Sequence, residues 1–285
     1  MSKLKVAEIF YSIQGEGRYA GVPSVFLRTF GCNFECRGFG LPNGVKSTDP
    51  EDIAKTIALY PSYDDLPLAR TGCDSYASWH PDFKHLSPMM TTDAVNDKMK
   101  SIIPNNKWMQ DDGHDIHLVI TGGEPLLGWQ RAYPELLGPC FDNGLTNITF
   151  ETNGTQEITD EFRHWLDDVA SAHALITFSV SPKLTCSGEA WADAIKPDTV
   201  TAYETIGNAY LKFVVATEQD VLEVEKAVAE YRFAGFTGPV YLMPVGGVED
   251  IYNLNTKQVA ELAMRRGYRY SPRLQVDIWR NAWGT

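Results

Sequence analysis

The sequence contains no long hydrophobic run. Its apolar stretches are short, and none approaches the ~20 residues that a membrane-spanning helix needs. The first residues, MSKLKVAEIFYSI, lack the charged start, the apolar middle and the small-residue cleavage site of a signal peptide. These absences predict a cytoplasmic protein without a membrane partner.

The chain also lacks an excess of basic residues and a regular set of cysteines. Lys and Arg number 25 against 37 Asp and Glu, so the formal net charge is −12. Proteins that bind a nucleic-acid duplex carry a basic patch, and we therefore expect no direct nucleic-acid partner. The cysteines, an odd number of five at irregular spacing, favour metal or redox chemistry over a disulfide framework.

Apolar runs rich in β-branched and aromatic residues predict strands, and stretches with helical periodicity separate most of them. The runs are VAEIFYSI, SVFLRTF, IHLVIT, NITFET, LITFSV, YLKFVVA and VYLMPV. The helical stretches include residues 158–169, 219–231 and 255–266. This alternation predicts an α/β fold with a parallel sheet, open or closed into a barrel, and flanking helices. We expect a single domain over residues 1–285, with an inserted loop at about 38–72 that is rich in Pro, Gly, Asp and Ser.

Several polar motifs follow the predicted strands directly. GCNFEC follows SVFLRTF, TGGEP ends IHLVI, ETNGT ends NITF, and SPK ends LITFSV. In parallel α/β folds the working residues gather on loops at the carboxyl ends of the strands. The four motifs are therefore expected to meet at one site.

Three of the cysteines, Cys32, Cys36 and Cys73, lie in two glycine-marked loops. Thiolates are the ligands of a 4Fe-4S cluster, and three of them would leave one iron free to bind a small cofactor. Two alternatives are a zinc site, which would need a fourth ligand such as His80 or His85, and plain buried thiols. Cys140 and Cys186 are expected to be structural.

The motifs together carry a family resemblance. YSIQGEG at residues 11–17, the Arg28 strand, GCNFEC, TGGEP, ETNGT, SPK, LMP at 242–244 and the segment 275–279 resemble 7-carboxy-7-deazaguanine synthases, which are radical S-adenosylmethionine (SAM) enzymes. YSIQGEG is the specific element, whereas TGGEP and ETNGT identify only the superfamily. The resemblance implies a partial β/α barrel, a homodimer, a 4Fe-4S cluster, SAM and Mg²⁺. It also implies an electron donor such as flavodoxin, the substrate 6-carboxy-5,6,7,8-tetrahydropterin, and the products 7-carboxy-7-deazaguanine and ammonia.

The cysteine spacing departs from the superfamily pattern, which is C-x3-C-x2-C. Phe39 occupies the place of the third cysteine, and 36 residues separate Cys36 from Cys73. Cys73-Asp74-Ser75 nevertheless resembles the third cysteine and the residues that follow it in the family. Because loop-closure entropy grows slowly with loop length, the insertion is expected to split the site without destroying it. We expect its middle to lie across the barrel mouth or at a subunit contact and to shield the cluster.

The resemblance also implies residue roles, and none of them is an acid or base. The TGGEP backbone would lie against the methionyl end of SAM, Glu151 would accept from the ribose, and Ser75 would bind Mg²⁺. The SAM-binding residues implied are Asp74, Gly122, Gly123, Glu124, Glu151, Ser181, Pro182 and Lys183.

The implied substrate-binding residues are Ile13, Gln14, Gly15, Glu16, Arg28 and Thr121. Arg28 lies on an apolar strand, where a buried guanidinium is costly unless it is paired. Its partner is either the carboxylate of the pterin or an internal carboxylate. Gln14 offers both a donor and an acceptor for the pyrimidinone edge, and Glu16 would contact ring nitrogens.

Two other functions compete with this interpretation. A radical SAM activase of a glycyl-radical enzyme would share the cluster and TGGEP but would have no need of YSIQGEG. A zinc-stabilised interaction module would have no catalytic activity at all.

Overall fold

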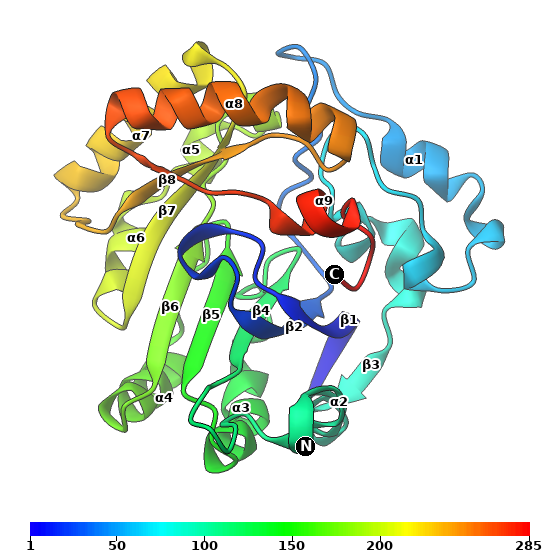
Figure 1. Ribbon diagram of the computed structural model, residues 1–285, viewed down its shortest axis with the longest axis vertical. Helices are drawn as coiled ribbons and strands as arrows, with labels where there is room; N and C mark the ends of the chain where they lie inside the picture. Colours follow the sequence, from blue (N-terminus) through cyan, green and yellow to red (C-terminus); the bar gives the residue numbers. More distant parts are fainter.

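The computed structural model describes residues 1–285 and contains one nine-stranded sheet in the order β3-β1-β2-β4-β5-β6-β7-β8-β9. The strands are β1 (Lys3–Ile13), β2 (Pro23–Thr29), β3 (Met89–Thr91), β4 (His117–Gly122), β5 (Asn147–Thr152), β6 (Leu175–Val180), β7 (Asn208–Val215), β8 (Val240–Pro244) and β9 (Arg269–Tyr270). From β2 to β9 every neighbouring pair is parallel. The sheet is curved and its two edge strands do not pair with each other, which makes a partial barrel (Figure 1).

The predicted parallel α/β fold is confirmed, with one correction at the N-terminus. β1 is antiparallel to both β2 and β3. The short connection between β1 and β2, residues 14–22, contains one turn of 3-10 helix at Gly17–Tyr19 and no crossover helix. Because a parallel pair needs a long crossover connection, this short link imposes an antiparallel pair.

Helices follow most of the strands and cover the outer side of the sheet (Figure 1). The helices of the chain are α1 (Asp49–Ala54), α2 (Thr92–Ile102), α3 (Tyr133–Asp142), α4 (Asp160–Ser171), α5 (Trp191–Ala194), α6 (Pro197–Glu204), α7 (Glu218–Phe233), α8 (Glu249–Arg266) and α9 (Leu274–Trp279). Two of them do not cover the outer side: α1 belongs to the insertion, and α9 carries Gln275 to the barrel interior. No helix is both long enough and apolar enough to cross a membrane.

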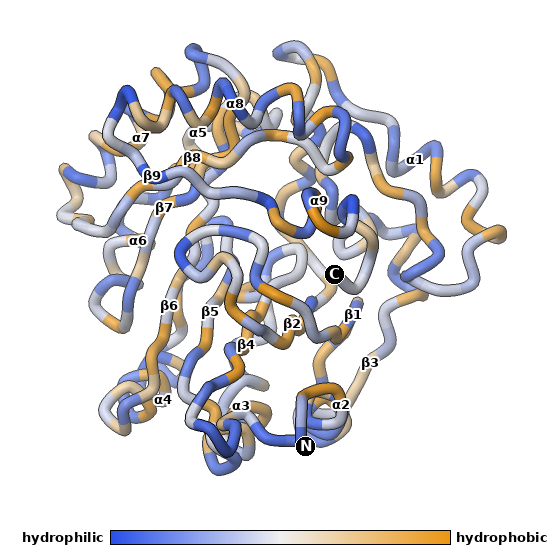
Figure 2. Tube along the Cα trace, viewed as in Figure 1, coloured by the Kyte–Doolittle hydropathy of each residue, from blue (hydrophilic) through white to orange (hydrophobic).

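Successive side chains of the strands divide between two environments, as the two-residue period of a strand requires. On β7, Leu211 and Phe213 belong to the large hydrophobic core between sheet and helices, whereas Lys212 lines the barrel interior. On β5, Phe150 belongs to the same core and Glu151 lines the interior. The resulting mixture of apolar and polar residues along the strands is visible in Figure 2. The polar interior distinguishes this sheet from parallel sheets that are apolar on both faces.

The insertion at residues 38–72 forms α1 and two 3-10 turns, Ile57–Leu59 and Tyr63–Asp65. Its ends return to one point, because the Gly72 amide donates to the Phe39 carbonyl at 2.8 Å. Its apolar side chains belong to a second, smaller core of Ala7, Tyr63, Leu66, Ala69, Tyr76, Ala77 and Phe83, against which Trp283 packs. The insertion is thus attached to the segment that follows Cys73 and to the C-terminus.

Candidate active site

A large cavity lies inside the barrel, and segments that are distant in the sequence line it. Its walls include the β1–β2 connection, both cysteine segments, the loops after β4, β5 and β6, and residues 281–285. The predicted site residues that line it are Ile13, Gln14, Gly15, Glu16, Arg28, Cys32, Cys36, Cys73, Asp74, Ser75, Thr121, Gly122, Gly123, Glu151, Ser181 and Lys183. Glu124 and Pro182 do not line it.

Cys32, Cys36 and Cys73 face this cavity as free thiols. The loop of the first two is fixed by Glu189, whose carboxylate accepts from the backbone amides of Glu35 at 3.0 Å and Cys36 at 2.7 Å. Cys36 itself adopts a left-handed backbone conformation, with φ of 51°. Such a conformation is uncommon outside glycine and is concentrated at functional sites.

The chemistry of these thiols fits a multi-iron cluster. Burial raises the pKa of Cys32 to about 12 and that of Cys73 to about 11, so stable thiolates here require a positive partner such as iron. In a 4Fe-4S cluster each cysteine binds a different iron, and the thiols need not converge on one point. No three Cys, His, Asp or Glu side chains converge on a single-ion site, and neither His80 nor His85 lines the cavity. The zinc alternative therefore has no support.

The TGGEP loop after β4 packs directly on the first cysteine loop. A Cβ atom on Gly123 would lie 2.4 Å from the Gly31 carbonyl oxygen and 2.7 Å from the Cys32 Cβ, so only glycine fits. The Glu124 amide donates to the same Gly31 carbonyl at 2.8 Å. The close contact places the Gly122–Gly123 backbone beside the cysteines.

The carboxylate of Glu124 is fully buried behind this loop. It accepts from the amides of Asn153 at 2.7 Å and Leu126 at 3.0 Å, and from the Thr152 hydroxyl at 2.8 Å. Burial raises the pKa of Glu124 to about 7, although these hydrogen bonds oppose the shift. Its side chain joins TGGEP to ETNGT, and the structure shows no face of it available to a ligand in the cavity.

The SPK motif supplies a free cation. Ser181 and Lys183 line the cavity, and the Lys183 ammonium donates to the Ser181 hydroxyl at 3.1 Å. Unlike the other basic side chains of the cavity, Arg28, Lys212 and Arg273, Lys183 forms no ion pair. It is therefore available for an anionic group near the cysteines.

The floor of the cavity comes from YSIQGEG, which enters from the amino end of the barrel. Gln14 donates to the Glu151 carboxylate at 3.2 Å, and Glu16 accepts from Lys212 at 2.6 Å. A Cβ atom on Gly15 would lie 1.8 Å from Oε1 of Gln275. The absence of a side chain at Gly15 thus admits the C-terminal segment to the floor.

Arg28 is paired inside the protein, as one of the two sequence interpretations proposed. Its Nε donates at 2.6 Å to Glu8, its cross-strand neighbour on β1. Its Nη1 donates to the Ser75 hydroxyl at 3.2 Å. Arg28 still lines the cavity, so the guanidinium stands between the internal carboxylate and any bound ligand.

Known proteins identify the family, although no family model matches the sequence. The 7-carboxy-7-deazaguanine synthase of Halobacterium salinarum is 34% identical over 98% of this chain and 91% of the relative. That of Pyrobaculum aerophilum is 30% identical over 99% of this chain and 97% of the relative. The chain belongs to the 7-carboxy-7-deazaguanine synthase family.

The fold agrees with this family assignment. A crystal structure of QueE from Escherichia coli aligns with a TM-score of 0.54 and covers 94% of this chain and 93% of that chain, at 19% identity. The resemblance inferred from the motifs is confirmed, and so is the radical SAM type of barrel. The activase and the zinc module are not favoured.

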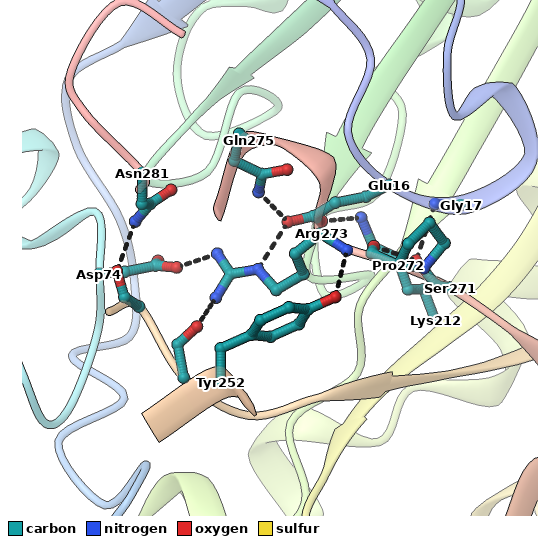
Figure 3. Close-up of polar contacts among 12 residues, drawn as sticks. Glu16, Gly17, Asp74, Lys212, Tyr252, Ser271, Pro272, Arg273, Gln275 and Asn281 are labelled. Atoms are coloured by element: carbon teal, nitrogen blue, oxygen red, sulfur yellow. Dashed lines mark hydrogen bonds and ion pairs between the residues drawn. The ribbon is translucent and has the colours of Figure 1, made fainter. Parts of the chain in front are cut away.

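Two charged residues of this synthase-family cavity were missed in the sequence. Lys212 on β7 bonds Glu16 at 2.6 Å and Glu151 at 2.8 Å. Arg273 bonds Glu16 at 3.1 Å, the Asp74 carboxylate and the Gly246 carbonyl (Figure 3). Lys212 had a detectable signal, because a lysine within the apolar run YLKFVVA raises the same question of pairing as Arg28 in SVFLRTF. The local sequence around Arg273 gives no comparable signal of a buried charge.

Proposed function

We propose that the protein converts 6-carboxy-5,6,7,8-tetrahydropterin to 7-carboxy-7-deazaguanine, with release of ammonia, in 7-deazapurine biosynthesis. The observation that carries the proposal is that three unpaired cysteines and the polar side chains of YSIQGEG line one cavity. When bound, the 4Fe-4S cluster and SAM supply the radical that starts the reaction. The protein positions the reactants and excludes water.

Within this proposal, the cysteines hold the cluster and the neighbouring loops hold SAM. Gly122 and Gly123 allow a ligand to approach the backbone closely. Glu151, 16% exposed at the side chain, offers acceptor oxygens for ribose hydroxyls, and Lys183 offers a cation for the carboxylate of SAM. Glu124 supports the TGGEP loop because its carboxylate accepts from the amides of Asn153 and Leu126. In this proposal the carboxylate does not contact SAM.

The pterin would lie over the floor and against the β1–β2 wall. Gln14 and Glu16 provide the hydrogen-bonding groups, and Ile13, Gly15 and Thr121 complete the surface. Arg28 keeps N–H groups beyond those used by Glu8 and Ser75, which suits a carboxylate. Phe10 and Phe26 stack at 4.8 Å and also line the cavity, so an aromatic surface is available for the bicyclic ring.

Mg²⁺ would be bound at Ser75. The Ser75 hydroxyl lines the cavity beside the Asp74 carboxylate, but the protein brings no complete oxygen shell together there. Mg²⁺ commonly keeps waters and binds substrate oxygens alongside one or two protein ligands. Substrate and water would therefore complete the coordination.

The test is an anaerobic incubation of reconstituted protein with SAM, dithionite, Mg²⁺ and the carboxytetrahydropterin, followed by mass analysis. The expected result is 7-carboxy-7-deazaguanine in amounts exceeding the SAM consumed. Deuterium on the pterin should appear in recovered SAM. Stoichiometric loss of SAM without this product would contradict the proposal.

Some family features remain predictions that rest on the resemblance. They are the homodimer and a flavodoxin-type electron donor. The cytoplasmic location and the single domain over residues 1–285 stay predictions from the sequence itself.

A further inference from the structure

A buried lysine lies between two carboxylates in the floor of the cavity. Lys212 is 2% exposed, and its ammonium donates to one oxygen of Glu16 at 2.6 Å and one oxygen of Glu151 at 2.8 Å. Both oxygens are thus bound to the same nitrogen, and two negative charges are close neighbours. The two carboxylates come from segments that are distant in the sequence, Glu16 from YSIQGEG and Glu151 from β5.

The remaining contacts of the two carboxylates are unequal. The other oxygen of Glu16 accepts from Arg273 at 3.1 Å and from Gln275 at 2.7 Å. Glu151 accepts only from neutral groups besides Lys212, namely Gln14 at 3.2 Å and Ser179 at 2.8 Å. The charged or titratable groups that face this pair are Lys212, Arg273, Asp74 and Tyr210. Lys212 is therefore the one cation that serves both carboxylates.

We propose that Lys212 is a positioning residue that bridges the Glu16 and Glu151 carboxylates, so that both present only acceptor oxygens to the ligands. The inference rests on the proposed function, in which Glu16 meets ring N–H groups of the pterin and Glu151 meets ribose hydroxyls of SAM. A protonated carboxyl carries a donor on one oxygen. That oxygen cannot accept from a ring N–H group, and a ribose hydroxyl could bond to it only by turning its own lone pair toward the proton.

The electrostatics of the floor support this role. Burial opposes ionisation of Glu16, but the Lys212 ammonium and the Arg273 guanidinium hold the pKa of its carboxyl well below the usual range. Without Lys212, two buried carboxylates would repel each other, and like charges in one site favour protonation of one of them. Glu151 would then lose its only cation, whereas Glu16 would keep Arg273.

The first experiment measures ligand affinity against pH in the anaerobically reconstituted holoenzyme. In Lys212→Met, the Kd of SAM should exceed that of wild type at acidic pH and should approach the wild-type value as the pH rises, because the acceptor form returns when the shared site loses its proton. Any pH dependence from Glu124, whose pKa is about 7, is common to all the variants, and wild type and Lys212→Arg, which keeps the cation, should lack the additional slope. Lys226→Met, which removes an exposed lysine on α7, is the matched control. A Lys212→Met profile parallel to that of wild type would overturn the proposal.

A second measurement does not depend on turnover. Difference infrared spectroscopy of Lys212→Met should show a protonated carboxylic acid that wild type lacks, and Glu151→Gln in the same background should remove it. Absence of the acid signal in Lys212→Met would overturn the proposal. If Lys212→Met does not fold, Lys212→Met/Glu151→Gln is expected to fold, because the remaining Glu16 has Arg273; failure of both variants would also overturn it.

Wild-type turnover separates the two hypotheses. If wild type does not convert the carboxytetrahydropterin, the proposed function fails. If wild type converts it while Lys212→Met shows neither the pH slope nor the acid signal, only the role of Lys212 fails.

Discussion

Two regions of the barrel interior both bury polar side chains, but the charges of these side chains are compensated differently. At the amino end, His117 is 3% exposed, bonds the Thr149 hydroxyl at 2.8 Å and lies edge-on to Tyr19 with ring centroids 4.5 Å apart. These partners are neutral, and burial lowers the pKa of His117 to about 4. At the cavity, Glu16, Lys212 and Arg273 remain charged because they pair with one another.

The difference shows which region performs chemistry. A buried polar group that only needs stability can become neutral, as His117 does. Buried ion pairs are expensive to desolvate and are weak contributors to stability, so their concentration around one cavity indicates a functional requirement. The cysteines and the free Lys183 line the same cavity as this charged cluster, which is consistent with the proposed site.

The largest expected effect at the cavity is the loss of the cluster. Cys73→Ser should remove iron and the brown colour as completely as Cys32→Ser or Cys36→Ser, because all three thiols face the cavity. Iron and sulfide analysis after anaerobic reconstitution measures this. Cys186→Ser is the control, since its thiol lies outside the lining and points to the Val214 carbonyl. A full cluster in Cys73→Ser would refute the split cysteine motif.

The next effect concerns the insertion that carries Cys73 back to the cavity. Of residues 38–72 only Phe39 and Gly72 line the cavity, so the middle does not shield the cluster directly, contrary to expectation. It supplies Tyr63 and Leu66 to the small core beneath the Cys73 segment. Replacing residues 45–66 by a short Gly/Ser linker should therefore allow cluster assembly but accelerate cluster loss in air.

A single substitution isolates this packing. Tyr63→Ala should cost roughly 3–5 kcal/mol, as for other large aromatic side chains removed from a core, and should also hasten cluster decay, followed by absorbance after exposure to air. Leu59→Ala, at a side chain 72% exposed in the same insertion, is the control and should behave as wild type. Equal decay rates for Tyr63→Ala and Leu59→Ala would show that the insertion is only tolerated.

Arg273 tests the charged network itself. It is 7% exposed and joins Glu16 to Asp74, so Arg273→Met leaves two half-buried carboxylates without this cation and should cost about 3 kcal/mol. The matched control is Arg70→Met, because Arg70 forms an ion pair with Asp250 at the surface and should change nothing measurable. Urea unfolding of the holoenzyme provides the comparison. Similar midpoints for the two variants would mean that the buried network contributes no stability.

The sequence predicted the fold and much of the cavity because those features obey local rules. TGGEP, ETNGT and SPK follow strands, and the ends of parallel strands meet at one edge. Lys212 and Arg273 were missed because their partners are distant: Glu16 lies 196 residues from Lys212, and Asp74 lies 199 residues from Arg273. The Glu124 carboxylate points away from the cavity and bonds the ETNGT loop. This direction depends on how the two neighbouring loops fold, which the TGGEP motif alone does not specify.

The smallest effect at neutral pH is expected at the amino end. The pKa of His117 is about 4 in the folded protein, against an ordinary value of 6.5 for a solvated histidine, so the unfolded chain binds a proton first as the pH falls. The free energy of unfolding should therefore decrease between pH 6.5 and 4, with a loss on the order of 3 kcal/mol from this residue. His117→Gln, which can still bond Thr149, should lack that part of the decrease. His114→Gln changes a side chain that is 85% exposed, and this variant should show the same decrease in the free energy of unfolding as wild type. Urea unfolding across this pH range decides the matter: identical acid slopes for wild type and His117→Gln would mean that His117 is already charged in the folded protein, and the contrast between the two regions of the barrel interior would be lost.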